Sequence, residues 1–254
     1  MTGHTWGEEW DEVADIVVVG AGAAGGTAAA TAVAEGASVI VVEKGPFPGG
    51  TTGKSGGQMW VPNNPLLRAR GLVDDRADAL RYMARTAYPV LYNPDHETLG
   101  LPADRYKVLE AFYDHGSEAV ELLLEVGAAT LESIPYADYY AHLPENTCPE
   151  GRTIAPILPP GWVPGRDTTG GQMLVDQLLE YATGAGAKVL VEHQVVRALR
   201  NTEGEVVGVE TRVGLRTELI GARKGVIFTS GGFLHDERRV LEHLKGPVLG
   251  GAAA

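Results

Sequence analysis

Three glycines near the start of the chain, Gly20, Gly22 and Gly25, have the spacing GxGxxG. The β-branched run Ile16–Val19 precedes them, and an alanine-rich run over residues 23–34 follows them. Between a buried strand and a helix, the first glycine permits a tight turn, the second lets a pyrophosphate approach the backbone, and the third lets the helix pack close to the strand. The helix N-terminus adds unpaired N–H groups and the positive end of the helix dipole. The spacing therefore predicts a dinucleotide site at Gly20, Gly22, Ala23, Ala24 and Gly25.

A carboxylate, Glu43, stands directly after a second apolar run, Val39–Val42. It follows the third glycine at close to the spacing of about 20 residues that is typical of a carboxylate holding an adenosine ribose. An acidic residue there favours a free 2′-hydroxyl, which indicates FAD or NAD rather than NADP. The alternative is a strand–helix–strand unit that turns on glycine for structural reasons alone and binds no nucleotide.

Residues 44–60, which follow that carboxylate, contain many glycines interleaved with hydroxyl side chains. So much glycine argues against regular secondary structure, and it removes side chains where a backbone must approach a ligand closely. The N–H and hydroxyl donors of this run suit a second phosphate and a flat ring system. A flexible surface loop is the alternative interpretation.

The chain has 254 residues and a formal net charge of −12, which argues against nucleic acid and anionic membrane surfaces as partners. Its single cysteine, Cys148, excludes an internal disulfide and suits a reducing compartment. The first residues lack the basic start and apolar core of a secretory signal, and no stretch approaches the roughly 18 apolar residues that span a bilayer. We therefore expect a cytoplasmic protein. No cluster of His, Cys and carboxylates has metal-ligand spacing, so no metal is predicted.

The remaining pattern predicts helices in the middle of the chain and strands near its end. Expected helices cover Asp74–Ala87, Asp104–His115, Glu118–Val126 after a break at Gly116-Ser117, Gly171–Ala182 and Asp236–Lys245. Expected strands cover Lys188–Val191, Val195–Arg200, Val206–Thr211, Arg216–Ile220 and Gly225–Thr229. Residues 1–12 are expected to be a flexible tail that Trp6 and Trp10 pin to the surface. Residues 132–169 are expected to be irregular, but too aromatic for disorder.

The cofactor motifs together resemble a known family. The GxGxxG turn, Glu43-Lys44 and the glycine run are similar to the FAD-binding signature of the fumarate reductase/succinate dehydrogenase flavoprotein superfamily. Residues 59–64 are most like its 3-ketosteroid Δ1-dehydrogenase branch. The resemblance implies FAD as the cofactor. It assigns FAD contacts to Glu43, Lys44, Gly50, Thr51, Thr52, Ser55, Gly56 and Gly57, to Val195 and Val196 beside the adenine, and to Ser230 and Gly231 in a loop that closes over the cofactor.

The same resemblance implies a Rossmann-like α/β FAD-binding domain, in which a parallel sheet carries a β-hairpin or meander and a helical insertion. The domain would span residues 13–254, with residues 65–169 as a mostly helical and loop insertion. In the family, a separate catalytic domain follows the segment that matches Ser230–Phe233, whereas few residues follow it here. We therefore expect the domain to be incomplete and the chain alone to be inactive as an enzyme.

An aromatic segment, residues 134–140, contains the catalytic candidates. In the ketosteroid dehydrogenases a tyrosine of the matching segment supports catalysis beside the flavin, which implies Tyr139 as first choice and Tyr136 as second. The family reaction removes hydrogens from C1 and C2 of a 3-ketosteroid. A tyrosinate-like base takes the C2 proton, the flavin accepts the C1 hydride, and hydrogen-bond donors polarise the 3-carbonyl. The alternative is a tyrosine that is packed in the core with its hydroxyl satisfied.

Three other functions stay open at this point. An enzyme like fumarate reductase or succinate dehydrogenase would need cations for two substrate carboxylates, and Arg152 and Arg166 are the loop cations available in this region. A non-catalytic, truncated flavin-binding fragment would share every cofactor motif. A nicotinamide-only protein would explain the first glycine motif but not the later glycine run. The expected partner is a small-molecule substrate, a steroid or another CH–CH donor, and the sequence indicates no particular electron acceptor.

Overall fold

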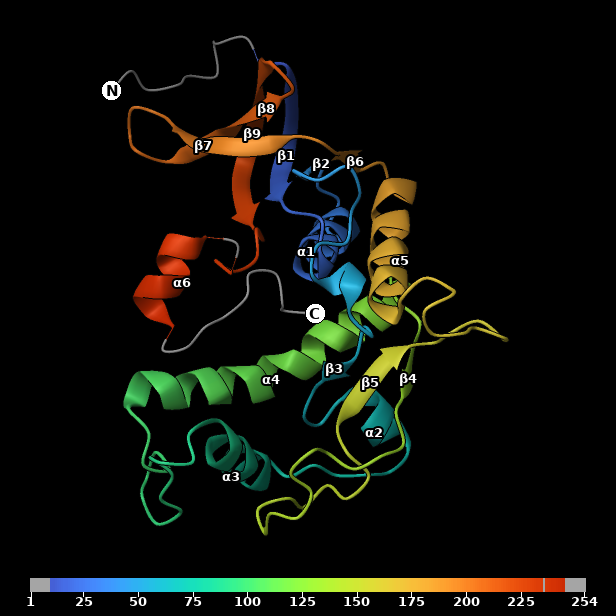
Figure 1. Ribbon diagram of the computed structural model, residues 1–254, viewed down its shortest axis with the longest axis vertical. Helices are drawn as coiled ribbons and strands as arrows, with labels where there is room; N and C mark the ends of the chain where they lie inside the picture. The colour runs from blue at the N-terminus through green and yellow to red at the C-terminus, as the bar shows by residue number, and fades with distance from the viewer. Residues whose placement is uncertain (1–9, 235, 245–254) are drawn as a thin grey trace. The chain divides into compact units, whose positions relative to one another are not determined.

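The protein divides into two compact units in the computed structural model, which describes residues 10–234 and 236–244 (Figure 1). Unit 1 combines the chain up to Gly57 with the chain from Leu158 onward. Unit 2 is the continuous stretch Gln58–Ile157, and it overlaps most of the insertion that was predicted over residues 65–169. Each unit has its own sheet and its own cavity.

Unit 1 is built on a six-stranded sheet. Its strands are β1, Glu12–Val19; β2, Val39–Val42; β6, Lys188–Leu190; β7, Gln194–Arg200; β8, Val206–Val213; and β9, Arg216–Phe228. They lie in the order β6-β2-β1-β9-β8-β7. Neighbours from β6 to β9 pair in parallel, whereas β9, β8 and β7 form an antiparallel meander. This confirms the predicted α/β architecture of a parallel sheet with a meander.

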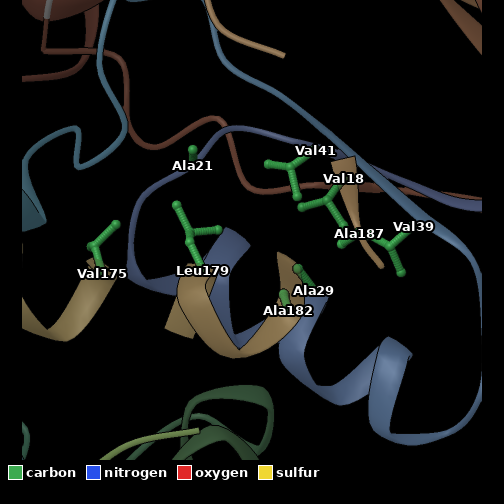
Figure 2. Close-up of a cluster of buried hydrophobic side chains, with 9 residues drawn as sticks. All are labelled: Val18, Ala21, Ala29, Val39, Val41, Val175, Leu179, Ala182 and Ala187. Atoms are coloured by element: carbon green, nitrogen blue, oxygen red, sulfur yellow. The ribbon is translucent and has the colours of Figure 1, made fainter. Parts of the chain in front are cut away.

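Two helices cover one face of this sheet: α1, Ala23–Ala34, and α5, Gly170–Gly184. Small side chains on α1 let it lie close to α5, where a Cβ added to Gly26 would stand 2.9 Å from the Cβ of Leu178. Figure 2 shows the buried cluster between the helices and the sheet, made by Val18, Ala21, Ala29, Val39, Val41, Val175, Leu179, Ala182 and Ala187. The alanine-rich composition of α1 therefore serves close packing.

The opposite face of the same strands is also buried. Val17, Ile40 and Val42 belong to a second cluster with Val209 and Ile220 of the meander. Because both faces are covered, β1 and β2 show no polar alternation and have unbroken apolar runs instead. The turn after β1 therefore starts from a strand that is held on both sides.

Strand β9 is continuous from Arg216 to Phe228, where the sequence predicted two strands. Arg223 and Lys224 interrupt the apolar pattern in its middle. Both cations lie beside Asp15 of β1, with nitrogen–oxygen distances of 3.3 and 3.6 Å. These pairs let polar residues continue the strand, because the charges meet a partner on the neighbouring strand.

Residues 10–12 are part of the fold and not of the flexible tail that we expected, because β1 begins within them. The indole of Trp10 lies over Gly208 and Gly221, where the missing Cβ atoms leave room for its ring. Trp6, the other residue expected to pin the tail, is outside the described residues.

Two short helices complete the described part of unit 1. The 3-10 helix η1, Thr52–Lys54, lies inside the glycine-rich run, which was expected to lack regular structure. Helix α6, Glu237–His243, begins after Asp236, whose side chain accepts a hydrogen bond from the Arg239 backbone N at 3.1 Å. It confirms the predicted helix Asp236–Lys245 up to His243, and the last residue of that range is outside the described residues.

Unit 2 combines helices with a small antiparallel sheet. Its helices are α2, Pro65–Ala69; α3, Arg76–Ala87; and α4, Ala103–Glu125. Its strands are β3, Met59–Trp60; β4, Leu131–Ser133; and β5, Thr153–Pro156, and they lie in the order β3-β5-β4. The central strand β5 contradicts the expectation that residues 132–169 are irregular. Its pairing partners are remote in sequence, so no local pattern indicates them.

Helix α4 continues through Gly116 and Ser117, where the sequence predicted a break. The Ser117 hydroxyl donates to the Asn63 carbonyl at 2.9 Å and accepts from Arg68 Nη1 at 2.8 Å. A Cβ added to Gly116 would stand 3.6 Å from Cγ1 of Val61, so the helix packs closely at this point. A glycine inside a helix costs about 1 kcal/mol, and these tertiary contacts outweigh that cost.

Among the helices of residues 10–234 and 236–244, none is long and apolar enough to cross a membrane. No group of three or more His, Cys, Asp and Glu side chains in those ranges is placed to hold a metal ion.

Candidate functional site

The turn between β1 and α1 requires glycine at its first and third positions. Gly20 has a φ of +105°, and a Cβ there would lie 2.6 Å from the Thr229 carbonyl oxygen. A Cβ on Gly25 would overlap the Gly20 carbonyl oxygen, so the helix can approach the strand only with glycine at this position. These contacts give the first and third glycines the packing roles that their spacing predicts.

The second glycine, Gly22, differs from the other two because the protein itself leaves room for a side chain. Its φ is −86°, and an added Cβ would stand 3.6 Å from the Gly49 carbonyl oxygen and 3.7 Å from Thr52 Oγ1. Both are ordinary van der Waals distances. The packing of the protein therefore does not itself require glycine at position 22, and the bare backbone leaves room for close approach of a ligand.

A cleft of about 900 Å³ runs along this turn in unit 1. The residues predicted for the cofactor that line it are Gly20, Gly22, Ala23, Ala24, Glu43, Lys44, Gly50, Thr51, Thr52, Val195, Ser230 and Gly231. Gly232 and Phe233, in the loop predicted to close over the cofactor, also line it, whereas sequence reasoning missed Ala21, Lys54, His193, Gln194, Thr229, Asp236 and Arg239. The structure thus brings together segments that are far apart in the sequence: the turn after β1, the end of β2, the glycine run, the start of β7 and the end of β9.

Several predicted cofactor residues are not among those that line the cleft. Ser55 and Gly57 contact the start of α5: the Ser55 carbonyl accepts from the Gly171 N–H at 3.0 Å, and a Cβ on Gly57 would stand 2.6 Å from the Gly170 carbonyl carbon. Gly56 lies between them. Its carbonyl oxygen is so close to Gly170 that a Cβ added to Gly170 would overlap this oxygen. Gly57 and Gly170 therefore let the loop pack on the helix end, whereas a Cβ on Gly56 would meet no atom within 4 Å.

Val196 and Gly25 also lie outside the lining of the cleft. Val196 is the extra residue at a register shift between β7 and β8, since Val195 and Arg197 have partners on β8 and it has none. Such a bulge disrupts the regular alternation of side chains, and at this one Val195 lines the cleft whereas Val196 does not. Gly25 is buried in the packing of α1 on the turn.

The Glu43 carboxylate is 9% exposed and holds the loops of the cleft together. Its Oε2 accepts from the Ala21 N–H at 3.0 Å, and its Oε1 accepts from the Gly45 N–H at 2.7 Å. The first bond ties the glycine turn to the end of β2. The carboxylate also lines the cleft, so it is an acceptor that a ribose hydroxyl can reach.

Thr229 fixes the same turn from the other side. Its hydroxyl donates to the carbonyl oxygens of Val19 at 2.8 Å and Gly20 at 3.0 Å, and its N–H donates to Val19 at 2.8 Å. The sequence predicted only a strand residue at this position, because its partners lie at the other end of the chain.

Unit 2 contains a separate pocket of about 550 Å³. Its lining comes from β3, α3, α4, β5 and the loop before β5: Gln58, Trp60, Tyr82, Met83, Thr86, Ala87, Leu109, Phe112, Tyr136, Ala137, Asp138, Tyr139, Tyr140 and Thr153. Most of these side chains are aromatic or aliphatic. No Lys, Arg or His is among them, so the described lining has no cation.

Both catalytic candidates of the sequence line this pocket. Tyr139 is 99% exposed, which excludes the alternative of a tyrosine packed in the core. Tyr136 is 58% exposed, and its hydroxyl accepts from Gln58 Nε2 at 3.1 Å. The phenol hydroxyls are therefore available at the pocket surface.

Arg152, one of the two arginines considered for a dicarboxylate, is fully buried. Its Nε and Nη2 donate to Asp74 at 2.7 and 2.8 Å, and its Nη1 donates to Asp138 at 2.7 Å. Burial opposes the charge, but the hydrogen bonds that Arg152 donates to the two carboxylates, together with their negative charge, outweigh it and raise the pKa of Arg152 above its ordinary value. Arg166, the other candidate, is exposed, belongs to unit 1 and pairs with its neighbour Asp167.

Comparisons with known proteins match nearly the whole chain. A family model described as FAD binding domain matches residues 15–252. The 3-oxosteroid 1-dehydrogenase of Mycolicibacterium smegmatis is 30% identical, over 92% of this chain and 49% of that protein. The 4-oxocyclohexanecarboxylate 2-dehydrogenase of Sinomonas cyclohexanicum is 29% identical, over 87% of this chain and 44% of that protein.

Among solved structures, a 3-ketosteroid delta1-dehydrogenase from Sterolibacterium denitrificans superposes with a TM-score of 0.70 at 24% identity. The superposition covers 94% of this chain and 51% of that one, and it shows a shared fold. The chain spans about half the length of the curated relatives it matches.

Proposed function

Because the chain belongs to the FAD binding domain family, with FAD as its cofactor, we propose that it is the FAD-binding part of an oxidoreductase that desaturates a carbon–carbon bond beside a ring ketone. We propose 3-ketosteroids as the substrate class. The relatives described above support this class, since both are named for substrates with a ketone on a six-membered ring.

The cleft of unit 1 fits FAD because of the bare backbone along its glycine loops. An added Cβ meets only ordinary contacts on Gly22 and nothing within 4 Å on Gly50. We assign the pyrophosphate to the turn at residues 20–24, the adenosine ribose to Glu43 and the adenine to Val195. When bound, FAD supplies the acceptor for the hydride that leaves the substrate.

The observation that carries the choice of substrate class is the lack of any cation in the described lining of the unit 2 pocket. A dicarboxylate would lose its hydration there without a counter-charge, which is costly. Asp138 is the charged residue in that lining, and its carboxylate is already paired with Arg152. A neutral apolar ring system with one carbonyl suits this pocket better than fumarate or succinate.

The hydroxyls of Tyr139 and Tyr136 are the polar groups that we assign to the ketone and to the proton on the neighbouring carbon. A carbonyl acidifies the adjacent C–H, and a phenol can donate to the carbonyl oxygen or, as phenolate, accept the proton. Tyr139 is the first choice for this role because of its exposure, and Tyr136 is the second.

The test is calorimetric titration of the FAD-loaded chain with a 3-ketosteroid and, separately, with fumarate. We expect saturable binding of the steroid and none of fumarate. In a matched pair of variants, Ala87→Trp adds a bulky ring to the pocket lining, whereas Ala77→Trp makes the same change at an exposed position of α3 outside it. Ala87→Trp should weaken steroid binding about tenfold or more, and Ala77→Trp should not. Binding of fumarate without binding of the steroid would contradict the proposal.

A further inference from the structure

In the loop of residues 136–140, which carries the two tyrosines, one residue is buried in unit 2. Asp138 lies between Tyr136 and Tyr139 in the sequence, and its side chain is 1% exposed although its neighbours are exposed. Its Oδ1 accepts from the Arg152 backbone N–H at 3.0 Å, and its Oδ2 accepts from Arg152 Nη1 at 2.7 Å. Two bonds to one residue fix both the position and the rotation of this carboxylate.

The same guanidinium lies over two aromatic rings that line the pocket. Its carbon lies 4.9 Å from the ring centroid of Tyr82 and 5.4 Å from that of Trp60, and both rings line the pocket. Arg152 itself does not line the pocket. It therefore connects the aromatic wall to the tyrosine loop without being placed to touch a ligand.

We propose that Asp138 and Arg152 are positioning residues, which hold the loop of residues 136–140 against the pocket and thereby set the affinity of the site for its ligand. This inference rests on the proposed function for the identity of that ligand. It assigns no contact with substrate to either residue.

Asp74, the second carboxylate on Arg152, provides a matched control. It accepts from Nε and Nη2 of the arginine and from the Asn63 N–H at 3.0 Å, so it has more hydrogen bonds than Asp138. It does not line the pocket. Replacing either aspartate by asparagine leaves one carboxylate for the guanidinium, so no buried charge is left unpaired.

The experiment compares Asp138→Asn with Asp74→Asn in the full chain loaded with FAD. Chymotrypsin cleavage after Tyr139 and Tyr140 under native conditions, mapped by mass spectrometry, reports opening of the loop. Urea unfolding reports global stability, and titration with a 3-ketosteroid reports affinity. We expect Asp138→Asn to raise loop cleavage and to weaken steroid binding, each about tenfold, and Asp74→Asn to change both much less.

A merely structural role predicts the opposite order, because Asp74 makes more bonds and its loss should destabilise the protein more. Loop cleavage that rises as much in Asp74→Asn as in Asp138→Asn would therefore overturn the inference, as would equal steroid affinities in the two variants. If the wild-type chain binds no 3-ketosteroid, the proposed function fails, while the cleavage comparison still decides whether Asp138 holds the loop. Should Asp138→Asn not fold, Asp138→Glu replaces it, because the longer side chain keeps the charge but cannot keep both bonds to Arg152 in the same geometry.

Discussion

The glycine turn in the cleft of unit 1 exposes backbone, whereas the pocket of unit 2 is lined mostly by aromatic and aliphatic side chains. Gly22 has no side chain, and the atoms nearest to an added Cβ there are the Gly49 carbonyl oxygen and Thr52 Oγ1. Around Tyr139 the lining is made of large side chains from several elements. A site formed by backbone depends on local conformation, so glycines at fixed intervals in the sequence indicate it. A side-chain site depends on packing among remote residues, and its position follows only from the fold.

The sharpest way to test this contrast is to remove the residue on which the unit 2 pocket depends. Arg152→Leu leaves the carboxylates of Asp74 and Asp138 buried without their partner. Breaking a buried ion pair in this way typically costs about 3–5 kcal/mol, so we expect the free energy of unfolding in urea to fall by that amount. The control is Arg81→Leu, which removes an exposed pair with Asp78 and should change stability by no more than about 0.5 kcal/mol. Equal effects of the two changes would contradict the buried network.

A second test compares two glycines of the same turn. Gly25→Ala forces a Cβ onto the Gly20 carbonyl and should cost about 3 kcal/mol of unfolding free energy, the upper range for overpacking. Gly22→Ala should leave stability nearly unchanged and weaken FAD binding, measured by flavin fluorescence. Gly184→Ala, in open space at the end of α5, is the control for the substitution itself. Full FAD affinity in Gly22→Ala would show that the ligand does not approach this glycine.

Glu43 is one of the side chains that line the cleft beside the glycine turn, so its removal measures what a side chain contributes to FAD binding there. Glu43→Ala should weaken FAD binding by roughly 1–3 kcal/mol, because it removes a charged acceptor and leaves the Ala21 and Gly45 N–H groups without it. Glu35→Ala, at the exposed C-terminal end of α1, changes the net charge equally and should have no effect. An unchanged FAD affinity in Glu43→Ala would remove this residue from the site.

The smallest change is expected at Tyr139. Tyr139→Phe removes only a hydroxyl from a fully exposed side chain, so the free energy of unfolding should stay within about 0.5 kcal/mol of the wild-type value. Steroid affinity in the same calorimetric assay should nevertheless fall, because the ketone loses a donor. A variant that loses stability but keeps its affinity would indicate a packing role instead.

The sequence predicted unit 1 far better than unit 2, because local sequence patterns determine much of unit 1 and packing among remote residues determines unit 2. The bounds of α1 and β2 match the predicted ranges, since an alanine-rich run between glycines and a run of β-branched residues are local signals. Ser55 shows the limit of such signals. A glycine-rich segment has the same composition whether it faces a ligand or packs on the end of α5.

Arg152 shows why the pocket of unit 2 was not predictable. Its partner Asp74 is 78 positions away in the sequence. The local Gly-Arg-Thr pattern is that of an exposed loop arginine, and only the fold shows that Arg152 pairs with Asp74. The aromatic segment around Tyr139 did indicate a pocket, but only through resemblance to a family. Its exposure and its neighbours on α3 and α4 follow from tertiary packing alone.

The long strand β9 also constrains how this protein reaches its native state. β1 must find β9 across about two hundred residues, whereas every contact within unit 2 closes inside one continuous segment. Contacts of such high sequence separation are slow to form, because the chain loses loop-closure entropy before the strand pairing contributes any stabilisation. During synthesis, unit 2 can therefore fold on the ribosome while β1 still has an open edge. That edge stays unpaired until β9 emerges, and an unpaired strand edge is prone to aggregation in a nascent chain.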